Sequence, residues 1–184
     1  MSARRELRLR LQAERALFLS GAMFQEAETH LTRHLRKVLL DLEPQVLGLY
    51  WPWRGEFNAR GALVADPALL NCAMALPFAQ RAPREMQYRL WDGNEPRLRD
   101  ECGIPASDGT VVVPDVVVAP CVGYTDDGYR LGYGGGYFDR WLAAHPHVCA
   151  IGVAFASARI ETSQLVPEAH DVPMTLVLTE HGPV

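Results

Sequence analysis

Apolar residues in the first part of the chain repeat at helical spacing. Over residues 3–19 they fall on one side of a helix, with arginines on the other side. The apolar side consists of Leu7, Leu11 and Phe18. Ser20 is a residue type that often caps helices, and it predicts the start of a second helix that continues to about Leu40. The apolar residues of this second helix are Phe24, Ala27, Leu31, Leu35 and Val38.

Apolar runs later in the chain predict strands. Two of them, "DVVVAP" at 115–120 and "HVCAIGVAF" at 147–155, are unbroken, which is the pattern of strands buried on both faces. The segment "MQYRLW" at 86–91 alternates between apolar and polar residues, which predicts an outer strand. Shorter runs predict strands within "QVLGLYWP" at 45–52, "CAMALP" at 72–77 and "TLVLTE" at 175–180, the last of which ends the chain.

The segments between the strands contain helices and one long irregular region. Residues 59–70 predict a helix, interrupted by Pro67, and a further helix begins near Gly136. Residues 80–110 are rich in proline, glycine and charge, which predicts an extended surface segment rather than a linker. Strands that alternate with helices predict an α/β fold, a three-layer αβα sandwich around a mostly parallel sheet, in one domain over residues 1–184. Ligands of such sheets bind beyond the carboxyl ends of the strands.

Composition excludes several classes of protein. The chain has 184 residues, of which 48% are hydrophobic and 22% charged, so it can form a core. Its formal net charge of −4 argues against nucleic acid or an anionic membrane as a partner. No apolar run approaches the roughly 18 residues of a membrane span, and the N-terminus lacks the features of a secretion signal. The four cysteines form no CxxC pair, which is typical of reduced thiols in a cytoplasmic protein.

The segment "DDGYRLGYGGGYFDRWLAAH", residues 126–145, is the best candidate for a ligand site. Its glycines let backbone N–H groups approach a ligand, and the helix start behind them adds unpaired donors, so the loop predicts a phosphate site. Arg130 and Arg140 add positive charge, and Asp139 offers an oxygen ligand for Mg²⁺. The loop is neither GxxxxGK[ST] nor GxGxxG, because Tyr137 stands where the last glycine belongs. From glycine content alone, a flexible turn remains an alternative.

The stretch "RLGYGGGYFDR", which starts at Arg130, resembles the signature of the 5-formyltetrahydrofolate cyclo-ligase family. That signature reads Arg-Leu-Gly, a variable residue, Gly, a variable residue, Gly-Tyr-Tyr-Asp, and Phe138 here replaces the second Tyr. The resemblance implies a cyclo-ligase or NagB-RpiA-like fold. It also implies conversion of 5-formyltetrahydrofolate to 5,10-methenyltetrahydrofolate, with ATP as co-substrate, Mg²⁺ as metal ion, and ADP and phosphate as products. A monomer or a weak homodimer is expected.

Two N-terminal segments extend the resemblance. The family motif on the first helix is Lys, three residues, Arg, and Arg4 and Arg8 stand at that spacing, on one helix face. Arg4 replaces the Lys, which keeps the charge but changes its shape; solvated helix arginines are the alternative. Glu56 in "LGLYWPWRGEFNAR" matches the family glutamate that contacts folate. Trp51 and Trp53 offer flat faces to a heterocycle, although either is also a natural core residue.

The C-terminal segment "VPEAHDVPMTLVLTE" completes the resemblance. Asp171 matches a family aspartate that helps to hold Mg²⁺; without the resemblance it would be a turn residue before Pro173. His170 is expected to be structural, because magnesium prefers oxygen. Three segments depart from the family pattern, which affects the expected substrate pocket more than the ATP site. They are "GIPASD" at 103–108, "CVGYTDDG" at 121–128 and "AFASARIE" at 154–161.

The resemblance implies a role for each matched residue. The implied catalytic residues are Arg130 and Tyr137. The implied ATP-binding residues are Arg4, Arg8, Arg130, Gly132, Tyr133, Gly134, Gly135, Gly136 and Arg140. The implied substrate-binding residues are Trp51, Glu56, Tyr133 and Tyr137, and the implied metal ligands are Asp139 and Asp171. Two other functions stay open: a relative that binds nucleotide or folate without turnover, and a different phosphoryl-transfer enzyme.

Overall fold

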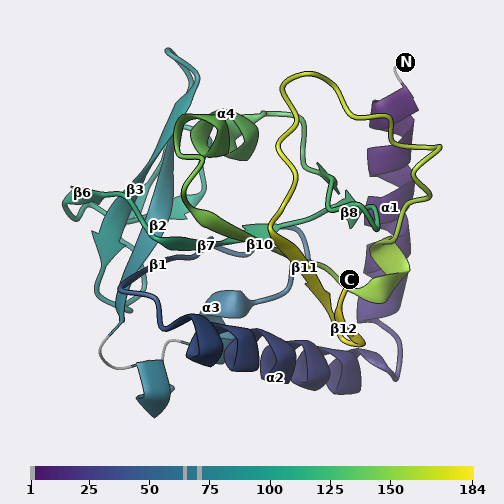
Figure 1. The fold of residues 1–184 in the computed structure, drawn as a ribbon, viewed down its shortest axis with the longest axis horizontal. Coiled ribbons are helices and arrows are strands. Elements are labelled where there is room, and N and C mark those ends of the chain that lie inside the picture. Colours follow the sequence, from purple (N-terminus) through teal and green to yellow (C-terminus); the bar gives the residue numbers. More distant parts are fainter. Residues whose placement is uncertain (1–2, 64–65, 70–71) are drawn as a thin grey trace.

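The computed structural model describes residues 3–63, 66–69 and 72–184. Its centre is an eight-stranded sheet with the order β12-β11-β10-β7-β1-β2-β3-β6 (Figure 1). The five strands from β11 to β2 are parallel, whereas β12, β3 and β6 are antiparallel to their neighbours. The bounds of these strands are β1 Val46–Gly48, β2 Ala73–Gln80, β3 Glu85–Trp91, β6 Val111–Val112, β7 Val116–Pro120, β10 Cys149–Val153, β11 Leu176–Thr179 and β12 Gly182–Pro183. This is the mostly parallel α/β sheet predicted from the sequence.

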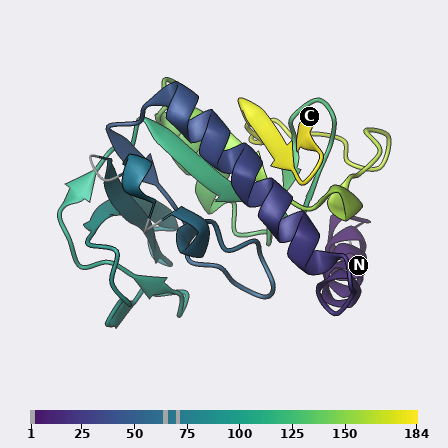
Figure 2. The same ribbon diagram turned by 90° about the horizontal axis from the view of Figure 1, so that it is seen from below.

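Helices cover both faces of this sheet (Figures 1 and 2). Helix α2, Phe24–Leu42, and the short α3, Ala59–Leu63, lie on one face, and α4, Tyr137–Ala144, lies on the other. Helix α1, Ala3–Leu19, lies beside the end of the sheet and packs near the 3₁₀ turn η2, Ala156–Ala158, that follows β10. None of the helices within the described ranges is long and apolar enough to cross a membrane.

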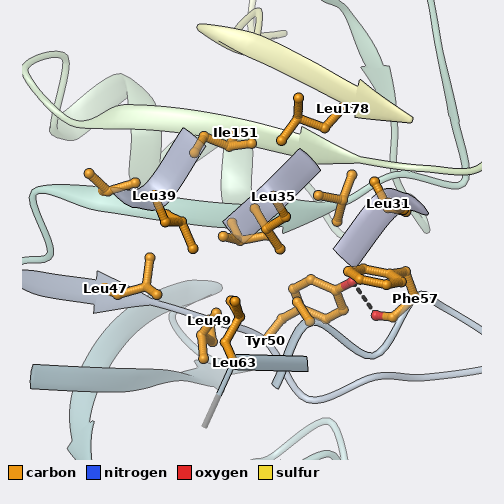
Figure 3. Packing of buried hydrophobic residues seen from close by; sticks show 14 of the residues in the cluster. Leu31, Leu35, Leu39, Leu47, Leu49, Tyr50, Phe57, Leu63, Ile151 and Leu178 are labelled. Carbon is orange, nitrogen blue, oxygen red and sulfur yellow. Dashed lines mark hydrogen bonds between the residues drawn. The ribbon is translucent and has the colours of Figure 1, made fainter. Parts of the chain in front are cut away.

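The two faces of the sheet bury separate apolar clusters. On the α2 side, the predicted core residues Leu31 and Leu35 pack over the sheet together with Leu39, one position beyond the predicted Val38 (Figure 3). In the same cluster the Tyr50 hydroxyl donates a hydrogen bond to the backbone oxygen of Phe57. On the α4 side, the ring of Trp141 meets the ring of Tyr88 edge to face, 4.9 Å between centroids. Together the clusters hold the strand ends in fixed positions around the site.

Gly48 leaves room for the second cluster. A Cβ atom at this position would lie 2.8 Å from the ring of Tyr88 and 2.9 Å from Val117, contacts closer than packed atoms tolerate. We therefore expect Gly48→Ala to lower the free energy of unfolding by about 1–3 kcal/mol, because one extra methyl group overpacks a filled core. Chemical denaturation of both proteins measures this difference. An unchanged midpoint and slope would contradict the close packing of Tyr88 over Gly48.

Five predictions about the elements are wrong in part. Ser20 does not cap α2: its hydroxyl donates to the Leu17 backbone oxygen, 2.8 Å away, and α2 begins at Phe24 without a side-chain cap. The predicted helix over 59–70 consists of α3 and a 3₁₀ turn, η1, Pro67–Leu69; residues 64–65 and 70 lie outside the described residues. The segment "TLVLTE" is not the last strand, since β12 pairs beside it. Pro67 lacks a backbone N–H, which explains the break in the helix predicted over 59–70.

The fourth correction concerns residues 80–110. This segment contains the seven-residue strand β3 and a two-stranded ribbon of β4, Leu98–Arg99, and β5, Pro105–Ala106. It also buries polar and small residues, namely Asp100, Ala106 and Ser107. Asp100 accepts hydrogen bonds from the backbone N–H groups of Cys102 and Ile104 and so holds a tight turn. Strand β3 was predicted to be an outer strand, but β6 pairs with its outer side.

Candidate functional site

A cavity of about 1070 Å³ opens beyond the carboxyl ends of the central strands. Its walls come from α1, from residues 50–56 after β1, from β2 and β3, from the turn at 100–104, from the glycine loop and from residues 168–171. Every site residue predicted from the sequence lines this cavity. Segments distant in sequence thus meet at one place. Their individual roles remain predictions.

The glycine loop reaches the cavity through a small β-ribbon. After β7 the chain forms β8, Gly123–Tyr124, and β9, Arg130–Leu131, which pair antiparallel and return the chain to the sheet end. Gly136, with φ +63°, then precedes α4, and Gly134 has φ +94°. A Cβ at Gly134 would stand 3.3 Å from the Arg8 guanidinium, and one at Gly132 would stand 2.7 Å from that of Arg130. The glycines therefore let two arginines lie against the loop backbone.

Arg130 lies under the loop and is only 8% exposed. Its Nη2 donates to Asp139 Oδ2 at 3.1 Å, and its guanidinium lies 5.1 Å from the centre of the Phe138 ring. Within the described part of the chain, its Nε has no hydrogen-bond partner. A buried cation with an unused donor beside a polar cavity is suited to bind an anion there.

Two other arginines near the glycine loop, Arg8 and Arg140, donate hydrogen bonds to different backbone oxygens. Arg8 Nε donates to the Gly132 backbone oxygen at 2.7 Å. Arg140 donates to two backbone oxygens, from Gly135 at 2.8 Å and from Arg84 at 3.0 Å, and so braces the loop against the β2–β3 turn. Burial lowers the pKa of Arg8 and the neighbouring charge of Arg4 lowers it further, while the charges of Glu168 and Asp171 act against this shift.

Three acidic residues of the cavity, Asp139, Glu168 and Asp171, are paired with arginines. Arg4 Nη2 donates to Asp171 Oδ2 at 2.5 Å, and Arg4 Nε lies 3.1 Å from Glu168 Oε1. The backbone N–H of Glu168 also donates to Asp171 at 2.8 Å. Burial raises the pKa of the Asp171 carboxyl, but the hydrogen bonds from Arg4 and Glu168 outweigh burial and hold that pKa below its usual value. Asp171 is therefore ionised at neutral pH.

Another part of the cavity wall, formed by residues 50–56, contains aromatic residues and Glu56. Residues 53–56 form a tight turn in which the Glu56 N–H donates to the Trp53 oxygen at 3.1 Å, and the Trp53 N–H donates back to Glu56 Oε2 at 2.8 Å. Burial raises the pKa of Glu56 to about 7, although hydrogen bonds and the charges of Arg15 and Arg130 act against it. A carboxyl group with this pKa can exchange a proton, or bind N–H donors as an anion, near neutral pH.

Three aromatic residues predicted from the sequence line the cavity. Trp51 is half-buried, with the Arg60 guanidinium 4.0 Å from its ring and Trp91 edge-on to it, so part of its role is packing. Trp53 is more exposed, at 39%. Tyr137 begins α4, and the Cys102 thiol donates to its hydroxyl at 3.3 Å.

The sequence interpretation missed two residues that shape the site. Arg15 was assigned to the solvated side of α1, but it is buried and donates to Cys121 and Tyr133. The signal was present in the spacing: positions 4, 8, 11 and 15 follow one face of a helix, and the buried Leu11 belongs to it. Cys102 was missed because its whole segment was treated as exposed.

Comparisons with known proteins agree with this geometry. A family model described as the 5-formyltetrahydrofolate cyclo-ligase family matches residues 1–180. The chain is 25% identical over 190 residues to the 5-formyltetrahydrofolate cyclo-ligase of Haemophilus influenzae, covering 95% of this chain and 96% of that protein. It is also similar to the 5,10-methenyltetrahydrofolate synthetase structure from Aquifex aeolicus, with 25% identity and a TM-score of 0.73, covering 99% of this chain and 92% of that one.

A second solved structure shares the fold. The 5,10-methenyltetrahydrofolate synthetase from Mycoplasma pneumoniae has a TM-score of 0.74 at 18% identity, covering 96% of this chain and 98% of that chain. The family match extends over almost the whole chain, including the glycine loop, the α1 arginines and Asp171 that line the cavity. This chain therefore belongs to the 5-formyltetrahydrofolate cyclo-ligase family.

Proposed function

We propose that the chain catalyses the ATP- and Mg²⁺-dependent conversion of 5-formyltetrahydrofolate to 5,10-methenyltetrahydrofolate, with release of ADP and phosphate. The observation that supports the proposal is that a cationic glycine loop, a carboxylate and aromatic residues line the same cavity. Its volume of about 1070 Å³ is at the upper end of single-ligand pockets, as expected for two substrates bound side by side.

The glycine-loop end is the proposed site of the ATP phosphates. The loop leads into the N-terminus of α4, where backbone N–H groups lack helical partners and favour anions. Arg8 and Arg130 lie against the loop and line the cavity, and the Arg130 guanidinium would stabilise the transferring phosphoryl group. Arg140 and the loop glycines Gly132–Gly136 would keep the backbone close to the nucleotide.

The two carboxylates at this end fit a magnesium ion. Asp139 and Asp171 both line the cavity and supply oxygen ligands, and nucleotide-bound Mg²⁺ needs one or two carboxylates besides phosphates and waters. Asp139 and Asp171 would hold the ion, which neutralises phosphate charge when bound. In its absence their charges are balanced by Arg130 and Arg4.

The part of the wall around Glu56 is the proposed folate site. A pterin presents adjacent N–H donors, and the Glu56 carboxylate is a suitable acceptor for them. Trp51 and Tyr133 offer flat surfaces beside it, and Tyr137 also lines the cavity.

The chemistry proposed for the pair of substrates explains the arrangement. The formyl oxygen attacks the γ-phosphorus of ATP and ADP leaves, which turns a poor leaving group into phosphate. N10 then attacks the formyl carbon, which closes the ring, and loses its proton; departure of phosphate breaks the C–O bond and forms the C=N bond of the methenyl product. The protein has to align oxygen and phosphorus and to stabilise the transferring charge, tasks proposed for Arg130 and Tyr137. No covalent enzyme intermediate is required.

Absorbance tests the proposal directly. The methenyl product absorbs in the near ultraviolet much more strongly than the formyl substrate, so purified protein with Mg-ATP and 5-formyltetrahydrofolate should produce a rising signal. Ligand-dependent melting shifts without that rise would instead indicate a protein that binds without turnover. Phosphorylation of another acceptor, with formylfolate ignored, would indicate a different phosphoryl-transfer enzyme.

A further inference from the structure

Arg15 is a buried cation for which the proposed chemistry has no use. It projects from α1 and is only 7% exposed. Its Nη2 donates to the Cys121 backbone oxygen at 2.7 Å and its Nη1 to the Tyr133 hydroxyl at 3.1 Å. Both partners are neutral. Removing a charge from water without an ion pair costs free energy. We therefore expect this buried arginine to have a function that offsets the cost.

Three segments of the cavity wall meet at this side chain. Besides the end of β7 at Cys121 and the glycine loop at Tyr133, the 53–56 turn packs on it, since a Cβ at Gly55 would lie 3.7 Å from Arg15 Cδ. Tyr133 continues the contact, because its hydroxyl also donates to the Trp53 backbone oxygen at 3.3 Å. Arg15 therefore connects the glycine loop to the turn that carries Glu56.

Glu56 itself lies next to Arg15. A small cavity of about 10 Å³, close to the space that one water occupies, is lined by both side chains and by Cys121. Burial raises the pKa of Glu56 to about 7, and among the charges that act against burial that of Arg15 comes first. The guanidinium is thus placed to interact with the carboxylate across this small cavity, through its charge or through one water.

The other groups around Glu56 are either neutral or already paired, so Arg15 is the cation that can balance its charge. Arg130 also faces the carboxylate but already pairs with Asp139. Tyr133 offers a hydroxyl. Tyr50 and Cys121 add no positive charge: burial raises the pKa of the Cys121 thiol to about 11 and that of Tyr50 well above its usual value, so both stay neutral.

We infer that Arg15 is a positioning residue of the folate end: it holds the Tyr133 hydroxyl against the 53–56 turn and balances the charge of the Glu56 carboxylate. The identity of the ligand rests on the proposed function, whereas the coupling of Arg15 to Glu56 does not. Arg15 acts through these two residues and not on the reacting atoms.

Kinetics over a range of pH test this inference. In wild type, kcat/KM for formylfolate should fall as pH drops below about 7, where Glu56 takes up a proton. Arg15→Met should move this fall to higher pH, so that kcat/KM is reduced about tenfold at about pH 6.5, with recovery at about pH 8.5. The KM for ATP should stay within about twofold of the wild-type value. The kcat/KM of Arg15→Lys for formylfolate should lie between those of wild type and Arg15→Met.

Arg10→Met is the matched control. Arg10 lies on the same helix but is exposed, with Glu14 at 3.7 Å, and its replacement should leave the profile unchanged. An equal loss for Arg15→Met at low and high pH, or an equal rise of both KM values, would show a general structural role and overturn the inference.

Stability measurements test the same coupling without activity. Glu56 has a higher pKa in the folded protein than its usual 4.5, so the folded state binds more protons between about pH 4.5 and 7. This contribution to stability is present at low pH and is lost as the pH rises through that window. Arg15→Met should extend the loss to higher pH in the protein without ligands.

Glu56→Gln should remove this pH dependence, and the double variant should have the slope of Glu56→Gln alone. If Arg15→Met changes the slope equally in the presence and absence of Glu56, the proposed coupling is wrong. A protein without cyclo-ligase activity would refute the proposed function but would leave these melting curves, and the inference on Arg15, open to the same test.

Discussion

Replacing Arg130 with methionine should reduce turnover about 100-fold or more, equivalent to about 2.7 kcal/mol of transition-state stabilisation. The side chain is buried under the glycine loop, pairs with Asp139 and lines the cavity. Charge that develops on a transferring phosphoryl group would lose its nearest fixed partner. Steady-state kinetics by product absorbance, with kcat and both KM values, measure the loss.

Two variants make this prediction specific. Arg130→Lys keeps the charge but not the planar fork, and it should recover only part of the activity. Arg159→Met removes an arginine of another ion pair, with Asp126, outside the cavity, and should leave turnover unchanged. Thermal unfolding checks that each protein is folded. Wild-type turnover in Arg130→Met would remove the phosphate-site assignment of the glycine loop.

Replacing Gly134 with alanine should raise the KM for ATP about tenfold or more, because φ +94° is strained for a residue with a side chain. The added methyl group would also stand 3.3 Å from the Arg8 guanidinium and displace it from the loop. Because Glu56 and Trp51 belong to another segment of the cavity wall, the KM for formylfolate should change much less.

Gly182→Ala is the matched control for backbone strain. Gly182 has φ +113° and lies in β12, at the edge of the sheet away from the cavity. Both variants should lose stability, of the order of 1–3 kcal/mol, but only Gly134→Ala should change ATP kinetics. Equal kinetic effects, or an effect of Gly134→Ala on formylfolate alone, would contradict the proposed position of the nucleotide.

Local patterns in the sequence were sufficient for the central elements. Leu31, Leu35 and Leu39 recur at helical spacing because one face of α2 has to be apolar to cover the sheet. The unbroken runs of β7 and β10 reflect strands buried on both sides. The glycine loop stood out because its glycine content is typical of neither a helix nor a strand. The order of its residues indicated the family.

Contacts between distant segments decided the rest. Ser20 is a residue type that caps helices, but its hydroxyl donates to a backbone oxygen of α1 instead of capping α2. The sequence does not reveal which of two possible partners a hydroxyl will bond. Residues 80–110 appear polar in sequence, yet Asp100 is buried because its own turn supplies hydrogen-bond donors. The short strands β6 and β12 exist only because an edge of the sheet offers unpaired backbone groups.

The sequence by itself determined the type of sheet, the position of the glycine loop and the family, because helical and strand periodicity and local glycine content are encoded over a few neighbouring residues. Only the tertiary structure decided that Arg15 lies inside the wall, with neutral partners from 106 and 118 residues away and beside the Glu56 carboxyl. Burial and the charges that alter a pKa arise from the packing of segments far apart in the chain, and no local pattern encodes them.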